Sequence, residues 1–159
     1  MGPSTDELQA LVDRAAIDAL QRAYADGVTR RDWPQVRSLF LPDAKVHLDL
    51  VDRAGRELVG PDALTSFVAT AIERFSFFEF VILNATIDLW PGGDPTKATA
   101  RIFMCELRAE GDPPVRNEAF GRYQDEYRKV DGTWRIARRR YRSMARFPDG
   151  VVHPLVEDA

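Results

Sequence analysis

One carboxylate stands among apolar residues in the second half of the chain. Glu106 follows Ile102 and Met104 at intervals of two, so in a strand the three side chains lie on one face of the sheet. If that face lines a pocket, the carboxylate is isolated among apolar groups, a setting that suits a general acid or base. The alternative is that Glu106 lies near the end of the strand, or pairs with Arg101 or Arg122 on a solvated face.

The pair His47 and Asp49 has a spacing that could hold a metal ion. In a strand, however, Val46 and Leu48 alternate with them and take the inner face, so both polar side chains should point outward. His153 is the only other histidine, which leaves too few ligands, and we predict no metal site. The chain also lacks a glycine-rich phosphate loop, a Ser-His-Asp arrangement and a Cys-x-x-Cys pair, so we expect no cofactor.

Several arginines crowd the last predicted strand and could bind a phosphate or coenzyme A. They are Arg135, Arg138, Arg139, Arg140, Arg142 and Arg146. Charges on a terminal strand more often form a solvated edge, and Asp125 and Glu126 on the preceding strand can pair with them. We therefore interpret most of this run as surface.

Three helices are predicted in the first half of the chain. Ser4-Thr5-Asp6-Glu7 has the spacing of a capping box, and apolar residues at intervals of three and four continue to about Arg30, which predicts a long first helix. Asp32 as a cap predicts a short second helix that Pro42 ends. Gly60-Pro61-Asp62 opens a third helix.

The rest of the chain has the pattern of strands. A period of two marks residues 44–51, and Arg53-Ala54-Gly55 turns the chain into a short return strand. Long strands follow at residues 77–90, 96–109, 115–130 and 133–144. A strand of about 14 residues at about 3.3 Å each is too long to lie flat in a domain of this size, so the sheet must bend. We predict an α+β fold in which a strongly curved, mostly antiparallel sheet wraps around the long first helix as a cone.

Both faces of the strands at residues 77–90 and 96–109 are apolar. Phe78 and Phe80, for example, alternate with Val81 and Leu83. One face can pack on the helices, while the other would leave an apolar patch in water. We predict a homodimer or higher homo-oligomer that packs through the outer face of the sheet. Residues 4–146 should form one domain, and residues 147–159 a C-terminal tail across the pocket mouth or the partner subunit.

Composition narrows the class of protein. The 159 residues fit one domain, and 22 basic against 25 acidic side chains give a net charge of -3, which argues against nucleic acid or a membrane surface as a partner. Cys105 is the only cysteine, which suits a reducing compartment, and no apolar run approaches the about 20 residues needed to cross a bilayer. We expect a cytoplasmic protein.

Short motifs are distributed over most of the chain. They are Arg14-Ala15-Ala16-Ile17, Tyr24, Arg31-Asp32-Trp33, Gly60-Pro61-Asp62-Ala63-Leu64, Gly121-Arg122-Tyr123-Gln124-Asp125-Glu126-Tyr127 and Asp131-Gly132-Thr133-Trp134-Arg135-Ile136. From about Leu8 to Arg140, this pattern resembles the SnoaL-like proteins of the nuclear-transport-factor-two-like superfamily. The resemblance implies a cystatin-like α+β barrel with a small-molecule pocket inside the cone.

The resemblance extends to enzymes such as scytalone dehydratase, bile-acid dehydratase and hexachlorocyclohexane dehydrochlorinase, which use an Asp–His dyad. When the motifs are matched, the aspartate falls on Thr29 and the histidine on Phe80. Threonine cannot ionise and phenylalanine cannot accept a proton, so the usual dyad is absent. The resemblance also implies that Tyr24 is an acid or oxyanion donor, that Asn84 matches an asparagine of the third strand, and that Arg140 matches an active-site arginine.

These observations support two hypotheses about function and leave open whether the chain is an enzyme. The first is a cofactor-independent lyase, isomerase or cyclase acting on an apolar, ring-containing substrate, with Tyr24 as acid or oxyanion donor and Glu106 or Asp125 as base. The substrate would be bound by Thr29, Phe80, Asn84, Met104, Tyr123 and Arg140. The second is a non-catalytic pocket, in a ligand-binding protein or in an accessory subunit like the beta subunits of ring-hydroxylating dioxygenases.

Overall fold

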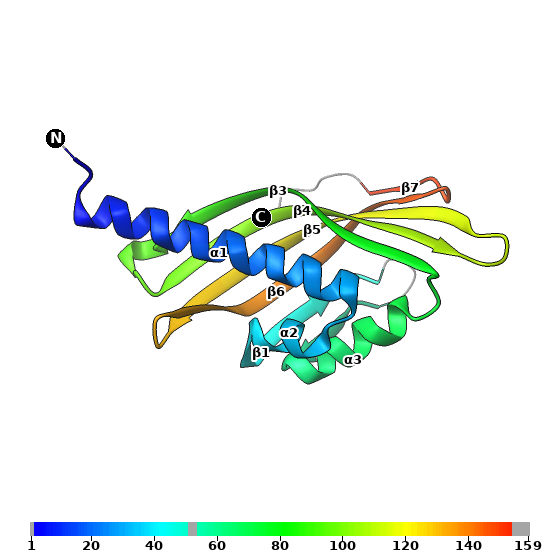
Figure 1. Ribbon diagram of the computed structural model, residues 1–159, viewed down its shortest axis with the longest axis horizontal. Coiled ribbons are helices and arrows are strands. Elements are labelled where there is room, and N and C mark those ends of the chain that lie inside the picture. The colour runs from blue at the N-terminus through cyan, green and yellow to red at the C-terminus, as the bar shows by residue number, and fades with distance from the viewer. Residues whose placement is uncertain (1, 51–53, 154–159) are drawn as a thin grey trace.

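The computed structural model describes residues 2–50 and 54–153, and its helices gather on one side of a long curved sheet (Figure 1). The helices are α1 (Thr5–Arg30), α2 (Trp33–Ser38) and α3 (Pro61–Ile72). The predicted capping box starts α1: the Glu7 amide donates to Ser4 Oγ at 3.2 Å, and the Ser4 amide donates to the Glu7 carboxylate at 2.7 Å. No helix of the described residues is long and apolar enough to cross a membrane.

The sheet is mostly antiparallel, as predicted. Its strands are β1 (Phe40–Leu48), β2 (Arg56–Val59), β3 (Phe77–Leu89), β4 (Lys97–Glu110), β5 (Val115–Val130), β6 (Thr133–Phe147) and β7 (Val151–Val152). The order is β2-β1-β6-β5-β4-β3, with β7 paired to β6, and the only parallel pair among these described strands is β1 with β6. A short 3-10 turn, η1 (Pro91–Gly93), joins β3 to β4.

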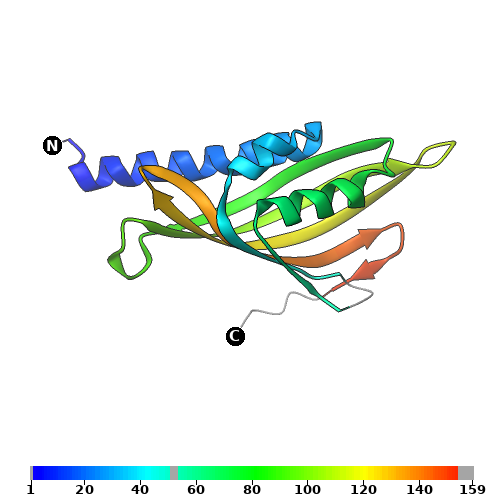
Figure 2. The same ribbon diagram turned by 90° about the horizontal axis from the view of Figure 1, so that it is seen from below.

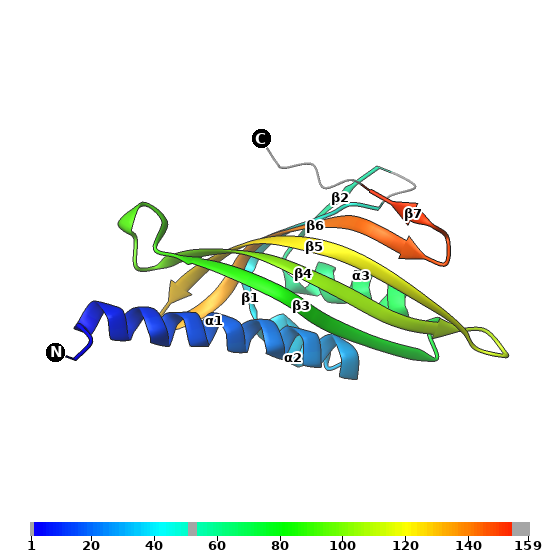
Figure 3. The same cartoon turned by 90° about the horizontal axis from the view of Figure 1, so that it is seen from above.

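The curvature of the sheet makes room for a core between the sheet and the helices. α1 runs along β3, and α3 covers the end where β1 and β2 lie (Figures 2 and 3). One stripe of α1 is buried against the sheet, but the predicted apolar spacing matches it only in the second half of the helix: Leu8, Leu11 and Val12 are exposed. The core side chains of α1 are Ile17, Leu20, Tyr24 and Val28.

A buried carboxylate fastens the first half of α1 to the end of the sheet. Asp13 is 2% exposed and accepts hydrogen bonds from Trp90 Nε1 at 3.1 Å and Trp134 Nε1 at 3.0 Å. Lys129 Nζ lies 2.5 Å from the same carboxylate. Burial alone would raise the pKa of Asp13, but these donors outweigh it and hold the pKa below its usual value.

Irregularities in the strand pairing change which side chains face inward. The register shifts between Ile82 and Asn84 in β3, so Leu83 is the extra residue there. In β6 the register against β5 skips Ala137 and, farther along, Met144. Each extra residue reverses the alternation for the rest of the strand, because successive side chains of a strand point to opposite faces.

Most predicted elements are present, with shifted ends. The second helix ends at Ser38, and Pro42 lies within β1 instead of ending the helix. The predicted turn at Arg53 and the end of the first strand at Val51 fall in residues 51–53, outside the described residues. β6 extends to Phe147, and β7 returns along it, so the predicted tail begins as a strand; residues 154–159 lie outside the described part of the chain.

Candidate functional site

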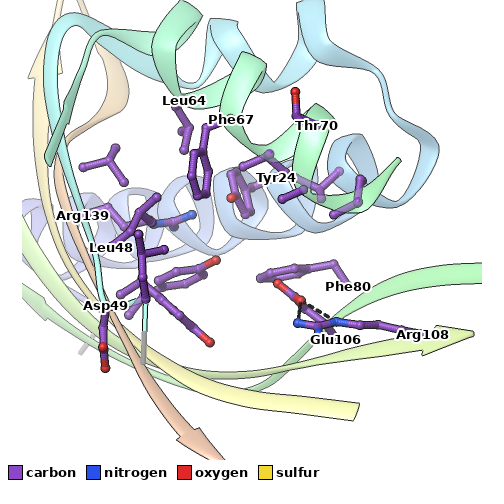
Figure 4. Close-up of a pocket in the computed structure, with 18 of the residues that line it drawn as sticks. Tyr24, Leu48, Asp49, Leu64, Phe67, Thr70, Phe80, Glu106, Arg108 and Arg139 are labelled. Atoms are coloured by element: carbon purple, nitrogen blue, oxygen red, sulfur yellow. Dashed lines mark hydrogen bonds and ion pairs between the residues drawn. The ribbon is translucent and has the colours of Figure 1, made fainter. Parts of the chain in front are cut away.

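A pocket of about 380 Å³ opens between α3 and the concave face of the sheet. Apolar side chains form much of its wall, and Figure 4 shows Leu64 and Phe67 of α3 facing Glu106 and Arg108 of β4 across it. Tyr24 reaches the pocket from α1, and Phe80 from β3. A ligand here would therefore touch an apolar surface with a few polar groups, as in most small-molecule sites.

The floor of the pocket holds a buried arginine. Arg139 is 1% exposed, and its guanidinium donates to the Asp125 carboxylate through Nε at 2.8 Å and Nη2 at 2.6 Å. Nη2 also donates to Gln21 Oε1 at 3.1 Å. Burial opposes the charge on Arg139, but Asp125 outweighs it and holds the pKa of the guanidinium well above its usual value. Arg139 is therefore a fixed positive charge.

One donor of this guanidinium remains unused. Arg139 Nη1 is buried and has no hydrogen-bond partner among the described residues. The guanidinium carbon lies 4.3 Å from the centre of the Tyr24 ring and 4.1 Å from that of Tyr123. Buried donors are rarely left unpaired in proteins, and an unpaired one at a pocket wall is a candidate ligand contact.

The tyrosines of the pocket form an aromatic cluster with Phe80. The Tyr24 ring stands edge-on to Phe80 at 5.4 Å, and the Tyr123 ring stacks on Phe80 at 6.0 Å. Tyr123 also contacts Tyr141 at 5.5 Å. Burial raises the pKa of Tyr24 and raises that of Tyr123 well above the usual value, while the charge of Arg139 partly opposes both shifts. Both hydroxyls are therefore protonated at neutral pH and can donate.

Tyr141 lies at the pocket because a glycine faces it across the strands. A Cβ built on Gly121 would come 2.2 Å from Cε2 of the Tyr141 ring, a distance that no side chain tolerates. Burial, with a smaller contribution from the Glu106 charge, raises the pKa of Tyr141 to about 12. The absence of a side chain at Gly121 thus lets a third neutral tyrosine line the pocket.

Glu106 lies on the pocket wall, as the alternation of its strand predicts. Its carboxylate accepts a hydrogen bond from Arg108 Nε at 2.9 Å, and Arg108 Nη2 forms a second, short bond to the same oxygen. The side chains of Glu106 and Arg108 are 20% and 15% exposed. The predicted alternative, an ion pair of Glu106 with Arg101 or Arg122, is wrong. The ion pair forms with Arg108, two residues farther along β4.

The predicted site residues separate into two groups. Tyr24, Phe80, Glu106 and Tyr123 line the pocket. Thr29, Met104 and Asp125 lie outside its lining, and each side chain is used by the fold. The Thr29 hydroxyl accepts the Phe80 amide at 3.0 Å, and Met104 is fully buried in the core.

Asp125 is fully buried beneath the pocket floor and has no free oxygen for a substrate. Besides the two bonds from Arg139, its carboxylate accepts from the Tyr127 hydroxyl at 2.6 Å and Gln21 Nε2 at 3.2 Å. The expectation that Asp125 acts as a base is therefore corrected: it holds Arg139 in place.

Two predicted contacts, Asn84 and Arg140, are exposed and lie outside the pocket lining. Extending the inward alternation of Phe80 and Ile82 leads to Asn84, but the extra residue Leu83 turns Asn84 outward. In β6 the extra residue Ala137 has the same effect, so Arg139 replaces Arg140 on the inner face.

Several pocket residues were missed by sequence reasoning. Arg139 and Arg146 belong to the arginine run interpreted as a surface, and the alternation of β6 alone could not separate them from their neighbours. Asp49, predicted to point outward, lines the pocket and accepts the Ser143 amide at 3.2 Å. His47 is exposed, as expected. Among the described residues, no group of three histidine, cysteine or acidic side chains could hold a metal ion.

Comparison with solved structures identifies proteins of the same fold. A proposed scytalone dehydratase from Novosphingobium aromaticivorans is similar with a TM-score of 0.78 and 22% identity, covering 98% of this chain and 99% of that chain. A hexachlorocyclohexane dehydrochlorinase (LinA) Type2 gives a TM-score of 0.77 and 17% identity, covering 96% and 99%. The hexachlorocyclohexane dehydrochlorinase LinA-type3 from Novosphingobium barchaimii gives a TM-score of 0.75 and 20% identity, covering 92% of this chain and 99% of that chain. At these identities the likeness shows the fold alone.

Comparison at the level of sequence identifies a family. No curated protein matches the chain significantly. A family model described as the SnoaL-like domain matches residues 9–140, which include all three helices almost entirely and most of the sheet. The match agrees with the curved sheet that packs on α1 and with the solved structures of similar shape. The chain therefore belongs to the SnoaL-like domain family.

Proposed function

We propose that the chain is a cofactor-independent enzyme of the lyase, isomerase or cyclase type that acts on an apolar, ring-containing substrate in this pocket. The reaction would begin with removal of a proton from a carbon next to a carbonyl group, which leaves an enolate oxygen to be stabilised. Structural neighbours named as a proposed scytalone dehydratase and dehydrochlorinases support this class of reaction.

The observation that carries the proposal is the unused donor of Arg139. Nη1 is buried at the floor of the pocket, beside the rings of two neutral tyrosines, Tyr24 and Tyr123. Donors held in place before the reaction, in a site with little water, stabilise a developing oxyanion far more than they would in water. A substrate carbonyl placed against Arg139 Nη1 and the Tyr24 hydroxyl would become a better carbon acid.

Glu106 is the base in this proposal. Its carboxylate lies on the pocket wall, and Arg108 holds the side chain in one orientation. The reaction also depends on acidification of the substrate by the oxyanion contacts. The proton removed by Glu106 either returns to another carbon, as in an isomerase, or the electron pair expels a leaving group, as in a lyase.

The test uses a panel of steroid, polyketide and terpenoid enones and hydroxy-ketones. Binding is measured by thermal shift, turnover by a change in mass, and proton removal by deuterium uptake from heavy water. We expect Glu106→Gln to lower kcat by about 100-fold or more, the usual scale for losing a general base, while binding persists. Tyr24→Phe should also lower kcat.

Glu126→Gln is the matched control, because Glu126 is exposed and pairs with Arg138 at 3.6 Å on the outside of the sheet. Its kcat should equal that of the unmodified protein. Turnover that persists in Glu106→Gln would refute Glu106 as the base.

A non-catalytic pocket is the second candidate, either in a ligand-binding protein or in an accessory subunit of an oxygenase. It is favoured by the replacement of the family's dyad with Thr29 and Phe80, whose hydroxyl and amide bond to each other at 3.0 Å. A raised melting temperature without any turnover across the panel would support this candidate. Instability of the chain when purified alone would point to the accessory subunit.

Self-association remains part of the proposal. Phe77 and Leu83 are 50% and 54% exposed on β3, so an apolar part of the sheet is left for a second copy to cover. Light scattering on the purified chain tests this, and a monomer at high concentration would contradict it.

Cys105 is a free, buried thiol, and we retain the prediction of a cytoplasmic location, which cell fractionation tests.

A further inference from the structure

Arginines outnumber carboxylates among the side chains that line the pocket. Four arginines and two carboxylates line it: Arg74, Arg108, Arg139, Arg146, Asp49 and Glu106. Three of these arginines have carboxylate partners: Arg74 with Glu110 at 3.3 Å, Arg108 with Glu106, and Arg139 with Asp125. Arg146 forms no ion pair with any carboxylate in the described part of the chain.

The position of Arg146 directs its charge toward the pocket. Across the sheet, Glu106 of β4 pairs with Ala119 of β5, and Ala119 pairs with Arg146 of β6. These three residues form one row on the inner face, and two strand spacings place the backbones of Glu106 and Arg146 about 10 Å apart. The small Ala119 side chain between them leaves room for an atom group of a ligand.

Arg146 also has an unused buried donor. Its Nε is buried and has no hydrogen-bond partner among residues 2–50 and 54–153. Asp49 already accepts the Ser143 amide, and Glu106 is bonded twice by Arg108. Arg146 Nε is therefore a donor that a ligand carboxylate could use, and a guanidinium matches a carboxylate in geometry and charge.

We propose that the pocket takes an amphipathic substrate whose apolar body lies against α3 and whose carboxylate pairs with Arg146. The apolar body would contact Leu64 and Phe67, which lie across the pocket from Glu106 and Arg108 (Figure 4). This assignment deepens the proposed function and rests on it, because it names the substrate class of the same pocket. The test of this assignment measures binding and does not require turnover. The substrate class and the proposed enzymatic function can therefore be refuted independently of each other.

The experiment compares naphthyl-alkanoic acids of increasing chain length with their methyl esters. Isothermal titration calorimetry gives the Kd of each acid and ester for the unmodified protein. For the acid of best-fitting length, we expect binding about tenfold tighter than that of its ester, equal to about 1.4 kcal/mol. Raising the salt concentration should narrow this ratio, because added ions screen the partly exposed Arg146.

Arg146→Gln should remove the difference between acid and ester while leaving the ester's Kd within about twofold. Arg138→Gln is the matched control on the same strand, since Arg138 is exposed and pairs with Glu126. It should keep the preference for the acid. If Arg146→Gln does not fold, Arg146→Lys, which retains the charge but not the fork, should reduce the preference without abolishing it.

Equal binding of acid and ester to the unmodified protein overturns the proposal, as does equal weakening of both by Arg146→Gln. Binding of neither ligand at any chain length also overturns it. Acid-selective binding in a protein that converts no compound of the enone panel would keep this assignment and reject the proposed enzyme.

Discussion

Replacing Asp125 by asparagine should destabilise the protein strongly, although the substitution keeps the shape of the side chain. The carboxylate accepts bonds from Arg139, Tyr127 and Gln21, and every one of these partners is a donor. An asparagine presents one oxygen and one amide, so its amide must face a donor. The buried charge of Arg139 would then lose its compensating charge.

The magnitude follows from burial. Asp125 and Arg139 are 0% and 1% exposed, and removing one partner of a buried ion pair costs about 3 to 5 kcal/mol of the free energy of unfolding. For a domain of this size, that loss lowers Tm by about 6 to 20 °C. Urea unfolding followed by circular dichroism measures the free energy directly.

A neighbouring pair provides the control. Glu126 and Arg138 are the next residues on β5 and β6, but their side chains are 55% and 46% exposed, so Glu126→Gln should cost about 0 to 1 kcal/mol. In the double variant Asp125→Asn with Arg139→Met, the loss should be smaller than the sum of the single losses, because no unpaired charge remains. A cost of Asp125→Asn as small as that of Glu126→Gln would refute the reasoning.

Two further variants test other contacts of the fold. Gly121→Ala would drive a methyl group into the Tyr141 ring, so we expect a loss of about 1 to 3 kcal/mol in urea unfolding and weaker ligand binding; unchanged values would contradict the close approach. Asp13 has a lowered pKa in the folded state, so its contribution to stability is complete above its ordinary value of 3.8 and is lost as the pH falls below it. The Asp13→Asn variant should therefore have a lower free energy of unfolding than the unmodified protein at neutral pH, and this free energy should fall less on acidification. Parallel curves of the free energy of unfolding against pH for the two proteins would contradict this.

The local pattern of the sequence determined most of the elements. The capping box at Ser4 and the spacing of apolar residues predicted α1, and the length of the later strands predicted a curved sheet. These features depend on short-range geometry, namely hydrogen bonds at a helix start and the periods of helix and strand. The alternation that puts Glu106 and Met104 on one face of β4 agrees with the pocket only in part, because Glu106 lines it and Met104 is buried in the core.

The tertiary structure decided which polar residues enter the pocket. Strand alternation extends over a whole strand only if the register is unbroken, and extra residues at Leu83 and Ala137 reverse it. For this reason Asn84 points outward and Arg139, not Arg140, lies on the floor. An extra residue depends on how two strands pair across the sheet, and no local spacing in one strand records it.

The pairing of charges was likewise decided by the fold. The sequence offered Asp125 as a base, but the convergence of Arg139, Tyr127 and Gln21 uses all of its hydrogen-bonding capacity. Tyr127 is a neighbour of Asp125 on β5, but Gln21 is distant along the chain and reaches the carboxylate only when α1 packs on the sheet. Residue type determined what chemistry each side chain could do, while long-range packing decided which donors stay free for a ligand, because a buried group that has a partner in the fold has none to offer.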